Sequence, residues 1–270
     1  MSGEMQKIIQ KLGLLSPVQD KSSDSEPPSL SPSPNPSPVQ NEASPASHEN
    51  SPASETSSLS NGLPNGLHEV KDDQGHVIQL IPFKEGKING TLEIFKKGKI
   101  SQSLSYKEGI LDGETIGYDD SGNLTHKLTY ENGELSGPSE MYSKGVLFLQ
   151  VSYQKNLKEG LEMSFRPTGA LFSERRFVNG KLNGLSKFFG ENGTLQRSAS
   201  YKDDFLEGDV ETFYPSGPLL EKSIYARNLL EGESTTYYEN GKILQKSLYK
   251  QGKLIGHTQH FNPKGKEIKA

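Results

Sequence analysis

An aromatic residue recurs every 23 or 24 positions from residue 83 to the end of this chain, so the sequence specifies an array of repeats. Each of these units has a second aromatic residue twelve positions after the first. These two repeat positions form two aromatic columns. Of the chain's 11 Tyr and 11 Phe residues, sixteen lie in the two columns, and we expect the columns to form the core. An earlier unit opens on Leu59. The repeat aromatics that open the other eight units are Phe83, Tyr106, Tyr130, Tyr153, Phe177, Tyr201, Tyr225 and Tyr249.

Two glycine-rich columns define a tight connection inside each unit. The fourth residue is always Gly, Asn or Asp, and these are the residues that tolerate a positive φ. The eighth residue is Gly in all nine units, and Asn never replaces it. We therefore predict a left-handed turn at the fourth position, and at the eighth a glycine covered by the ring that opens the same unit. From the second unit onward, these repeat glycines are Gly90, Gly113, Gly137, Gly160, Gly184, Gly208, Gly232 and Gly256.

The second connection in the unit also has a turn signature. Three units contain Pro-x-Gly, at 167–169, 215–217 and 263–265, which predicts a type I turn with the glycine closing a bulge. Each unit therefore consists of two short antiparallel strands, and nine units predict about eighteen strands. We expect residues 59–270 to form an all-β fold, an elongated single-layer antiparallel meander of hairpin repeats with one solvated face.

The first 58 residues have a different composition. Residues 16–58 are rich in Ser and Pro and have no aromatic residue, which predicts a disordered linker. Residues 1–15 have helical apolar spacing that is too short to be stable alone. This segment is either a frayed tail or a docking peptide that folds on a partner, and its apolar residues are Ile8, Ile9, Leu12 and Leu15.

The sequence contains no recognisable catalytic, cofactor or metal site. There is no cysteine, and no phosphate loop or nucleophile motif. His257 and His260 would face opposite sides of a strand, which argues against a shared metal ion. The formal net charge of −4 gives no general attraction to nucleic acid. With no Sec signal peptide and no long apolar stretch, we expect a cytoplasmic protein, and export by a specialised secretion system stays open.

The pattern Tyr-x-x-Gly-x-Leu-x-Gly-x-x-x-x-Tyr-x-x-x-Gly-x-Leu resembles the MORN repeat. It is most similar to the variant form found in bacterial YwqK-type antitoxin proteins. The resemblance implies a curved β-sheet that binds proteins or phospholipids, and the antitoxin relationship implies a toxin as partner.

Three hypotheses about function follow. The first is a non-catalytic scaffold that presents a β-repeat surface to a protein partner. The second is a membrane-surface module that binds phospholipid through lysines near the two ends of the array, such as Lys96 and Lys97 or Lys264 and Lys266. The third is a secreted bacterial effector or antitoxin-like protein, because the Ser-rich N-terminus resembles specialised secretion signals. An enzyme is not expected.

Overall fold

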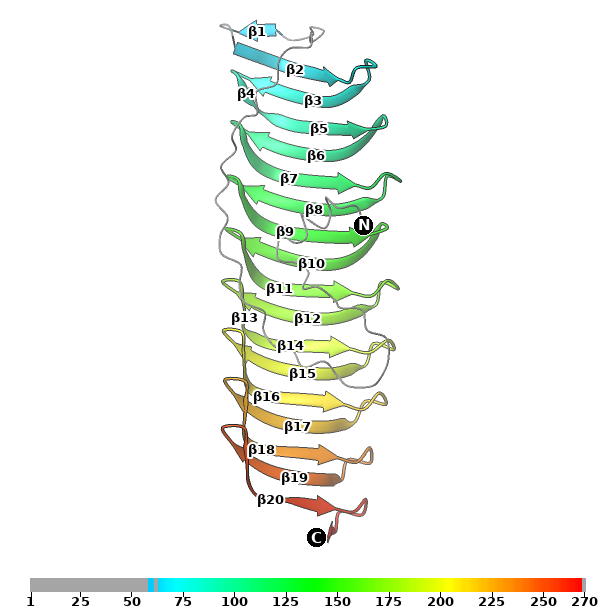
Figure 1. Cartoon of the computed structure of the whole chain (residues 1–270), viewed down its shortest axis with the longest axis vertical. Coiled ribbons are helices and arrows are strands. Elements are labelled where there is room, and N and C mark those ends of the chain that lie inside the picture. Colours follow the sequence, from blue (N-terminus) through cyan, green and yellow to red (C-terminus); the bar gives the residue numbers. More distant parts are fainter. Residues whose placement is uncertain (1–57, 61–62, 269–270) are drawn as a thin grey trace. The chain divides into compact units, whose positions relative to one another are not determined.

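The computed structural model describes residues 58–60 and 63–268 (Figure 1). Every described residue lies within residues 52–270, the second of the two units into which the chain divides. The predicted helical segment 1–15, with its docking residues Ile8, Ile9, Leu12 and Leu15, lies outside the described residues. The predicted linker 16–58 does so too, except for Ser58.

The described residues form one open antiparallel β-sheet, and each strand pairs with its neighbours in chain order (Figure 1). This confirms the predicted all-β meander. Two strands are interrupted by a single residue and a further short strand follows the last unit's second strand, so that 21 segments appear where about eighteen were expected. The segments are β1 (Ser58–Ser60), β2 (Leu63–Lys71), β3 (Val77–Lys84), β4 (Lys87–Ile88), β5 (Gly90–Lys96), β6 (Lys99–Lys107), β7 (Ile110–Tyr118), β8 (Leu124–Glu131), β9 (Glu134–Ser143), β10 (Val146–Gln154), β11 (Leu157–Phe165), β12 (Leu171–Val178), β13 (Lys181–Leu182), β14 (Gly184–Phe189), β15 (Leu195–Lys202), β16 (Phe205–Phe213), β17 (Leu219–Ala226), β18 (Leu229–Tyr237), β19 (Ile243–Lys250), β20 (Lys253–Phe261) and β21 (Glu267–Ile268).

The turn inside each unit has two consecutive left-handed residues, at its third and fourth positions. Their φ angles lie between +47° and +84° in all eight turns from Glu85–Gly86 to Gln251–Gly252. Two positive φ angles define the type I′ turn, whose twist matches that of the flanking strands. The left-handed fourth position is confirmed, also where it is Asn156, Asp204 or Asn228. The left-handed third position gave no sequence signal, because Glu, Lys, Arg and Gln occur there as well as Asn and Asp.

Each type I′ turn is hydrogen-bonded to the turn of the preceding unit. The fourth-position amide donates to a carbonyl 21 or 22 residues earlier, as from Gly133 N to Leu111 O at 2.7 Å. Where the fourth residue is Asn or Asp, its side-chain oxygen also accepts a hydrogen bond from that earlier strand. An example is the bond from Leu206 N to Asn228 Oδ1 at 2.6 Å. Asn and Asp therefore join adjacent repeats as well as tolerating the left-handed backbone.

The turns at the opposite edge of the sheet are of the predicted kind. The Gly169 amide donates to Arg166 O at 2.8 Å, which closes a turn with Pro167 at its second position. Arg166 N then donates to Ala170 O, and the φ of Gly169 is +84°, so the glycine sits in the bulge. Tyrosines also join repeats at this edge, as Tyr214 Oη donates to Tyr237 O at 2.8 Å.

The strand register corrects our account of the eighth-position glycine. Gly184 pairs with Tyr201 of the next unit, whereas Phe177 of its own unit pairs with Leu182 and Gly160. A Cβ added to Gly184 would meet the Arg176 side chain at 3.4 Å, and no ring atom within 4 Å. The prediction that the ring of the same unit covers this glycine is wrong. The φ of +102° at Gly184 explains the glycine instead, because it lies well beyond the left-handed helical value.

The two faces of the sheet differ in composition, because side chains alternate along each strand. We call the side that carries the opening aromatics the aromatic face and the other the charged face. The charged face bears cross-strand ion pairs, such as Lys222 with Glu211 at 3.1 Å. Along the middle of the aromatic face runs a central row, whose neighbours pair in register across most strands. Its members include Leu92, Leu104, Thr115, Leu128, Ser139, Val151, Glu162, Arg175, Ser186, Ala199, Val210, Ser223, Ser234 and Ser247.

The central row, rather than the aromatic columns, contains most of the buried side chains. Ser139, Ser186 and Ala199 are almost inaccessible, whereas most of the opening aromatics are half-buried. Only Tyr153 and Phe177 among those aromatics are buried. The expectation that the columns form the core was therefore too simple, because the small residues between the large ones lose more of their surface.

We expect Gly184→Ala to destabilise the protein by about 1–2 kcal/mol, because φ at this position is strained for any residue with a Cβ. Gly180→Asn should cost less than about 1 kcal/mol, since Asn156 and Asn228 occupy equivalent positions. The free energy of unfolding of the two variants, measured by denaturant titration, checks this. A larger loss for Gly180→Asn would contradict these roles of the two glycines.

Candidate interaction surface

The regular composition of the aromatic face is interrupted on β11 and β12. Lys158 occupies the sixth position of its unit, where most other units have Leu. Glu162 occupies the tenth position, and Arg175 lies two residues before the next opening aromatic. In the other units these last two positions hold uncharged residues or His68. The three positions at which a charged residue replaces the usual uncharged one therefore lie at one place in the array.

The three residues form one ionic cluster, which we call the Glu162 cluster. Glu162 pairs in register with Val151 on one side and with Arg175 on the other, and its side chain is only 1% exposed. Its carboxylate accepts a hydrogen bond from Lys158 Nζ at 2.5 Å and one from Arg175 Nη2. The two cationic side chains remain more accessible, at 19% for Lys158 and 35% for Arg175. The buried anion thus holds two partly exposed cations in place.

Aromatic rings line the same cluster. The Lys158 ammonium lies 4.9 Å and the Arg175 guanidinium 5.8 Å from the centre of the Phe177 ring, so one ring contacts both cations. Tyr153 is 6% exposed, and its hydroxyl has no hydrogen-bond partner. Burial first, and then the charge of Glu162, raise the pKa of this phenol. Tyr153 therefore remains a neutral donor whose hydrogen-bonding capacity is unused.

A further cation lies on the aromatic face next to the cluster. Arg197 of β15 is two strands from Arg175, and its Nε is buried without a hydrogen-bond partner. Burial raises the pKa of Tyr201, while the positive charges of Arg197 and Arg175 oppose that rise. Tyr201 is therefore close enough to both guanidinium groups to respond to their charge. With Lys158, the region has three cations around one carboxylate and can attract an anionic group.

His126 is the buried imidazole of the aromatic face. It pairs in register with Gly117, and a Cβ added to Gly117 would come within 2.1 Å of its ring. The predicted arrangement of a ring over a strand glycine therefore occurs here rather than at the eighth position. Burial lowers the pKa of His126, and Nδ1 lies 3.1 Å from the hydroxyl of Thr125.

The structure distributes the sequence-predicted residues along the whole array. The repeat glycines and aromatics recur on successive hairpins, so they do not converge on one site. Among the residues that the structure describes, no group of potential metal ligands comes together. Lys158 was already visible as a break in the leucine column. Glu162 and Arg175 gave a signal only when the three departures from the repeat are considered together.

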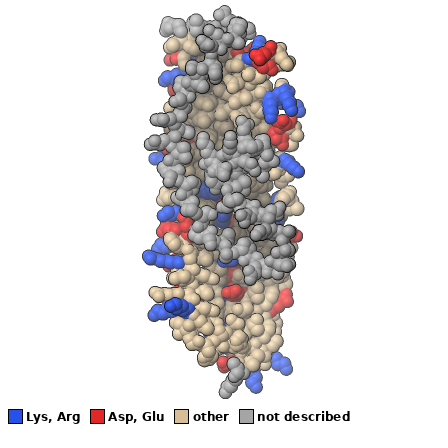
Figure 2. Space-filling view, in the orientation of Figure 1, with Lys and Arg blue, Asp and Glu red and all other residues tan. Residues whose placement is uncertain are grey.

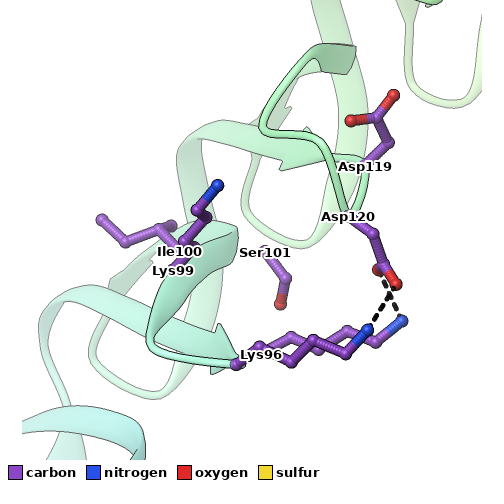
Figure 3. Close-up of a pocket in the computed structure, with 7 residues that line it drawn as sticks. Lys96, Lys99, Ile100, Ser101, Asp119 and Asp120 are labelled. Atoms are coloured by element: carbon purple, nitrogen blue, oxygen red, sulfur yellow. Dashed lines mark ion pairs between the residues drawn. The ribbon is translucent and has the colours of Figure 1, made fainter.

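The lysines near the first repeats surround a shallow depression at the sheet edge (Figure 3). Lys96 and Lys97 both pair with Asp120, at 2.6 Å and 3.5 Å, and all three side chains are exposed. The hydrogen bond from Lys96 lowers the pKa of Asp120. Exposed pairs of this kind contribute little binding energy or stability, and the paired lysines offer less free positive charge than their number suggests.

Three segments of the chain match the MORN repeat variant, at residues 111–132, 182–203 and 230–251. Each match begins just after one type I′ turn and ends within the next, so it spans one structural repeat. No curated protein matches the sequence. The MORN repeat variant is therefore shown at three sites, whereas no curated relative supports the finer likeness to YwqK-type antitoxins.

Two solved structures resemble part of this chain, those of TcdB2-TccC3-Cdc42 and TcdB2-TccC3-TEV. They are 9% and 10% identical, with TM-scores of 0.20 and 0.17. The matches cover 72% and 73% of this chain but only 15% and 14% of the other chains. Likenesses this weak support no conclusion about this protein.

We expect the stability of the protein to fall between pH 6.5 and pH 5 because of His126. The lowered pKa means that the unfolded state takes up a proton below about pH 6.5 while the buried ring stays neutral. His126→Leu should remove part of this slope. Denaturant titrations of the wild type and the His126→Leu variant at pH 7.5 and 5.5 measure this pH dependence of the free energy of unfolding. An equal dependence in the two proteins would contradict the role given to His126.

Proposed function

We propose that this protein is a non-catalytic scaffold that presents the aromatic face of its β-repeat array to a protein partner. MORN repeats are typically protein or membrane interaction modules, and three repeats of this chain match the variant. The observation that carries the proposal is the Glu162 cluster, in which a buried carboxylate binds two cations. It occurs in one repeat, and the central row contains no other charged residue among its named members. Buried ion pairs rarely stabilise a fold more than apolar residues do, so their presence here favours a role in recognition.

The charge distribution favours a protein over a membrane surface as partner. Lys and Arg are interspersed with Asp and Glu on the face shown in Figure 2. Several lysines of the charged face are paired, such as Lys222 with Asp209 at 2.7 Å and Lys246 with Glu233 at 2.7 Å. Attraction to anionic lipid needs an excess of positive charge, since each basic residue near the membrane contributes about 1 kcal/mol. Among the described residues, no helix is long and apolar enough to cross a membrane.

The nature of the partner follows from the sequence hypotheses. The resemblance to YwqK-type antitoxins supports a toxin as one class of partner. A secreted effector would use the same surface on a different target, and export of a reporter fused behind residues 1–30 would distinguish it from a cytoplasmic scaffold.

Capture of partners should depend on the aromatic face. Thr212→Glu with Gln245→Glu adds two negative charges there, and Gln150→Glu with Gln259→Glu adds the same charge to the charged face. With the full chain immobilised, we expect cell proteins to be retained by the wild type and the charged-face variant and lost by the aromatic-face variant. Equal retention by both folded variants would contradict the assignment of the face.

The chain should not bind anionic membranes. In flotation with phosphatidylserine–phosphatidylcholine vesicles, we expect the full chain to remain in the dense fraction at both low and physiological salt, because it has no net positive charge. Vesicles of phosphatidylcholine alone are the control. Salt-sensitive flotation with the phosphatidylserine vesicles would favour the membrane-surface module instead.

A further inference from the structure

The repeats provide an internal control for the Glu162 cluster. The unit that opens on Tyr201 has Leu206, Val210 and Ser223 at the three corresponding positions, and it forms the same strands and the same register. The fold therefore does not need charges there. Because desolvating the Glu162 carboxylate is costly, the cluster is expected to contribute less to stability than those neutral residues would.

Glu162 fixes the two cations and leaves them with an excess of charge. Its carboxylate bonds Lys158 through one oxygen and Arg175 through the other, so both side chains are held in defined positions. One negative charge cannot balance two positive ones, and Arg197 adds a third cation on the same face. Arg175 uses Nη2 for Glu162, while its Nε has no hydrogen-bond partner. This is a preorganised region with a net positive charge.

The spacing of the cations indicates the shape of the ligand. Arg175 on β12 and Arg197 on β15 are separated by β14 and are offset by two residues along the strands, because Ser173 and Arg197 both pair with Phe188. Two strand spacings of ~4.8 Å and two residues of ~3.3 Å place the two positions about 12 Å apart. A single phosphate group is too small to reach both guanidinium groups. An extended peptide advances about 3.3 Å per residue and directs alternate side chains to the same side, so carboxylates four residues apart face the same way with about this separation. Guanidinium groups bind carboxylates through paired, charge-assisted hydrogen bonds.

We propose that Lys158, Arg175 and Arg197 form a binding site for an acidic segment of a protein partner, with two carboxylates four residues apart. Glu162 is a positioning residue, because it orients Lys158 and Arg175 and is not itself a contact for an acidic ligand. Phe177 supports the two cations from within the sheet. The inference rests on the proposed scaffold function and names the site and the partner chemistry.

Two labelled peptides of equal composition test the site by fluorescence anisotropy with the full chain. One contains Glu-Gly-Gly-Gly-Glu repeated twice, and the other contains the same four Glu in one block followed by six Gly, so that no two of its carboxylates are four residues apart. We expect the spaced peptide to bind at least five times more tightly. Inorganic phosphate at the same total charge should not displace it. No binding of either peptide, or displacement by phosphate, would overturn the proposal.

A triple variant separates binding from folding. Lys158→Leu, Glu162→Ser and Arg175→Leu together copy neutral residues found at these positions in other units, so the melting temperature should equal or exceed that of the wild type. We expect its affinity for the spaced peptide to fall at least tenfold. The control variant Lys222→Ser, Glu233→Ser and Lys246→Ser makes the same change of net charge on the charged face. Its affinity should change less than twofold, and an equal loss in both variants would overturn the site.

Arg197→Gln is a second, single test, because Arg197 forms no ion pair in the structure with the Glu162 carboxylate. It should reduce the preference for the spaced peptide over the block peptide, and an unchanged preference would overturn the role of Arg197. The scaffold function can fail or stand separately. Partner capture through the aromatic face without peptide binding would refute only the acidic site, whereas peptide binding with face-independent capture would refute only the scaffold proposal.

Discussion

The sheet depends on one constraint, the pair of left-handed residues in every type I′ turn. This turn reverses the chain within two residues and keeps the twist of the strands. The backbone amide of the second left-handed residue also donates a hydrogen bond to the preceding unit, as from Gly109 N to Ile88 O at 2.8 Å. Adjacent repeats are thereby joined at the turn as well as along the strands. The strand register follows, and with it the separation of an aromatic from a charged face.

Because the sheet is built from similar repeats, the Glu162 cluster can be compared directly with the neutral residues at the same positions of other units. In a repeat array each unit contacts mainly its neighbours, so a departure from the pattern need not be compensated far away. The neutral units show what the fold requires, and Lys158, Glu162 and Arg175 show what one repeat adds to it. The buried carboxylate holds the two partly exposed cations through hydrogen bonds.

The sequence was sufficient for the meander, the type I turns at one edge and the left-handed fourth position of the turns at the other edge. Asn156, Asp204 and Asn228 revealed that position because they replace glycine there. The ring partner of Gly184 could not be predicted, since periodicity gives the spacing of residues but not which of two adjacent hairpins a glycine faces. The central row was also missed, because burial of Ser139 or Ser186 depends on larger neighbours and not on the residue itself. For the site, only Lys158 stood out singly.

Hydrogen exchange measured by NMR on the full chain tests the joined turns most directly. The second turn residue of an isolated type I′ hairpin exposes its amide to water, whereas the amides of Gly133, Asn156, Gly180 and Asn228 donate here to the preceding repeat. We predict that these amides exchange as slowly as those of the adjoining strands. Exchange at the rate of an unprotected turn, with the strand amides still protected, would contradict the account.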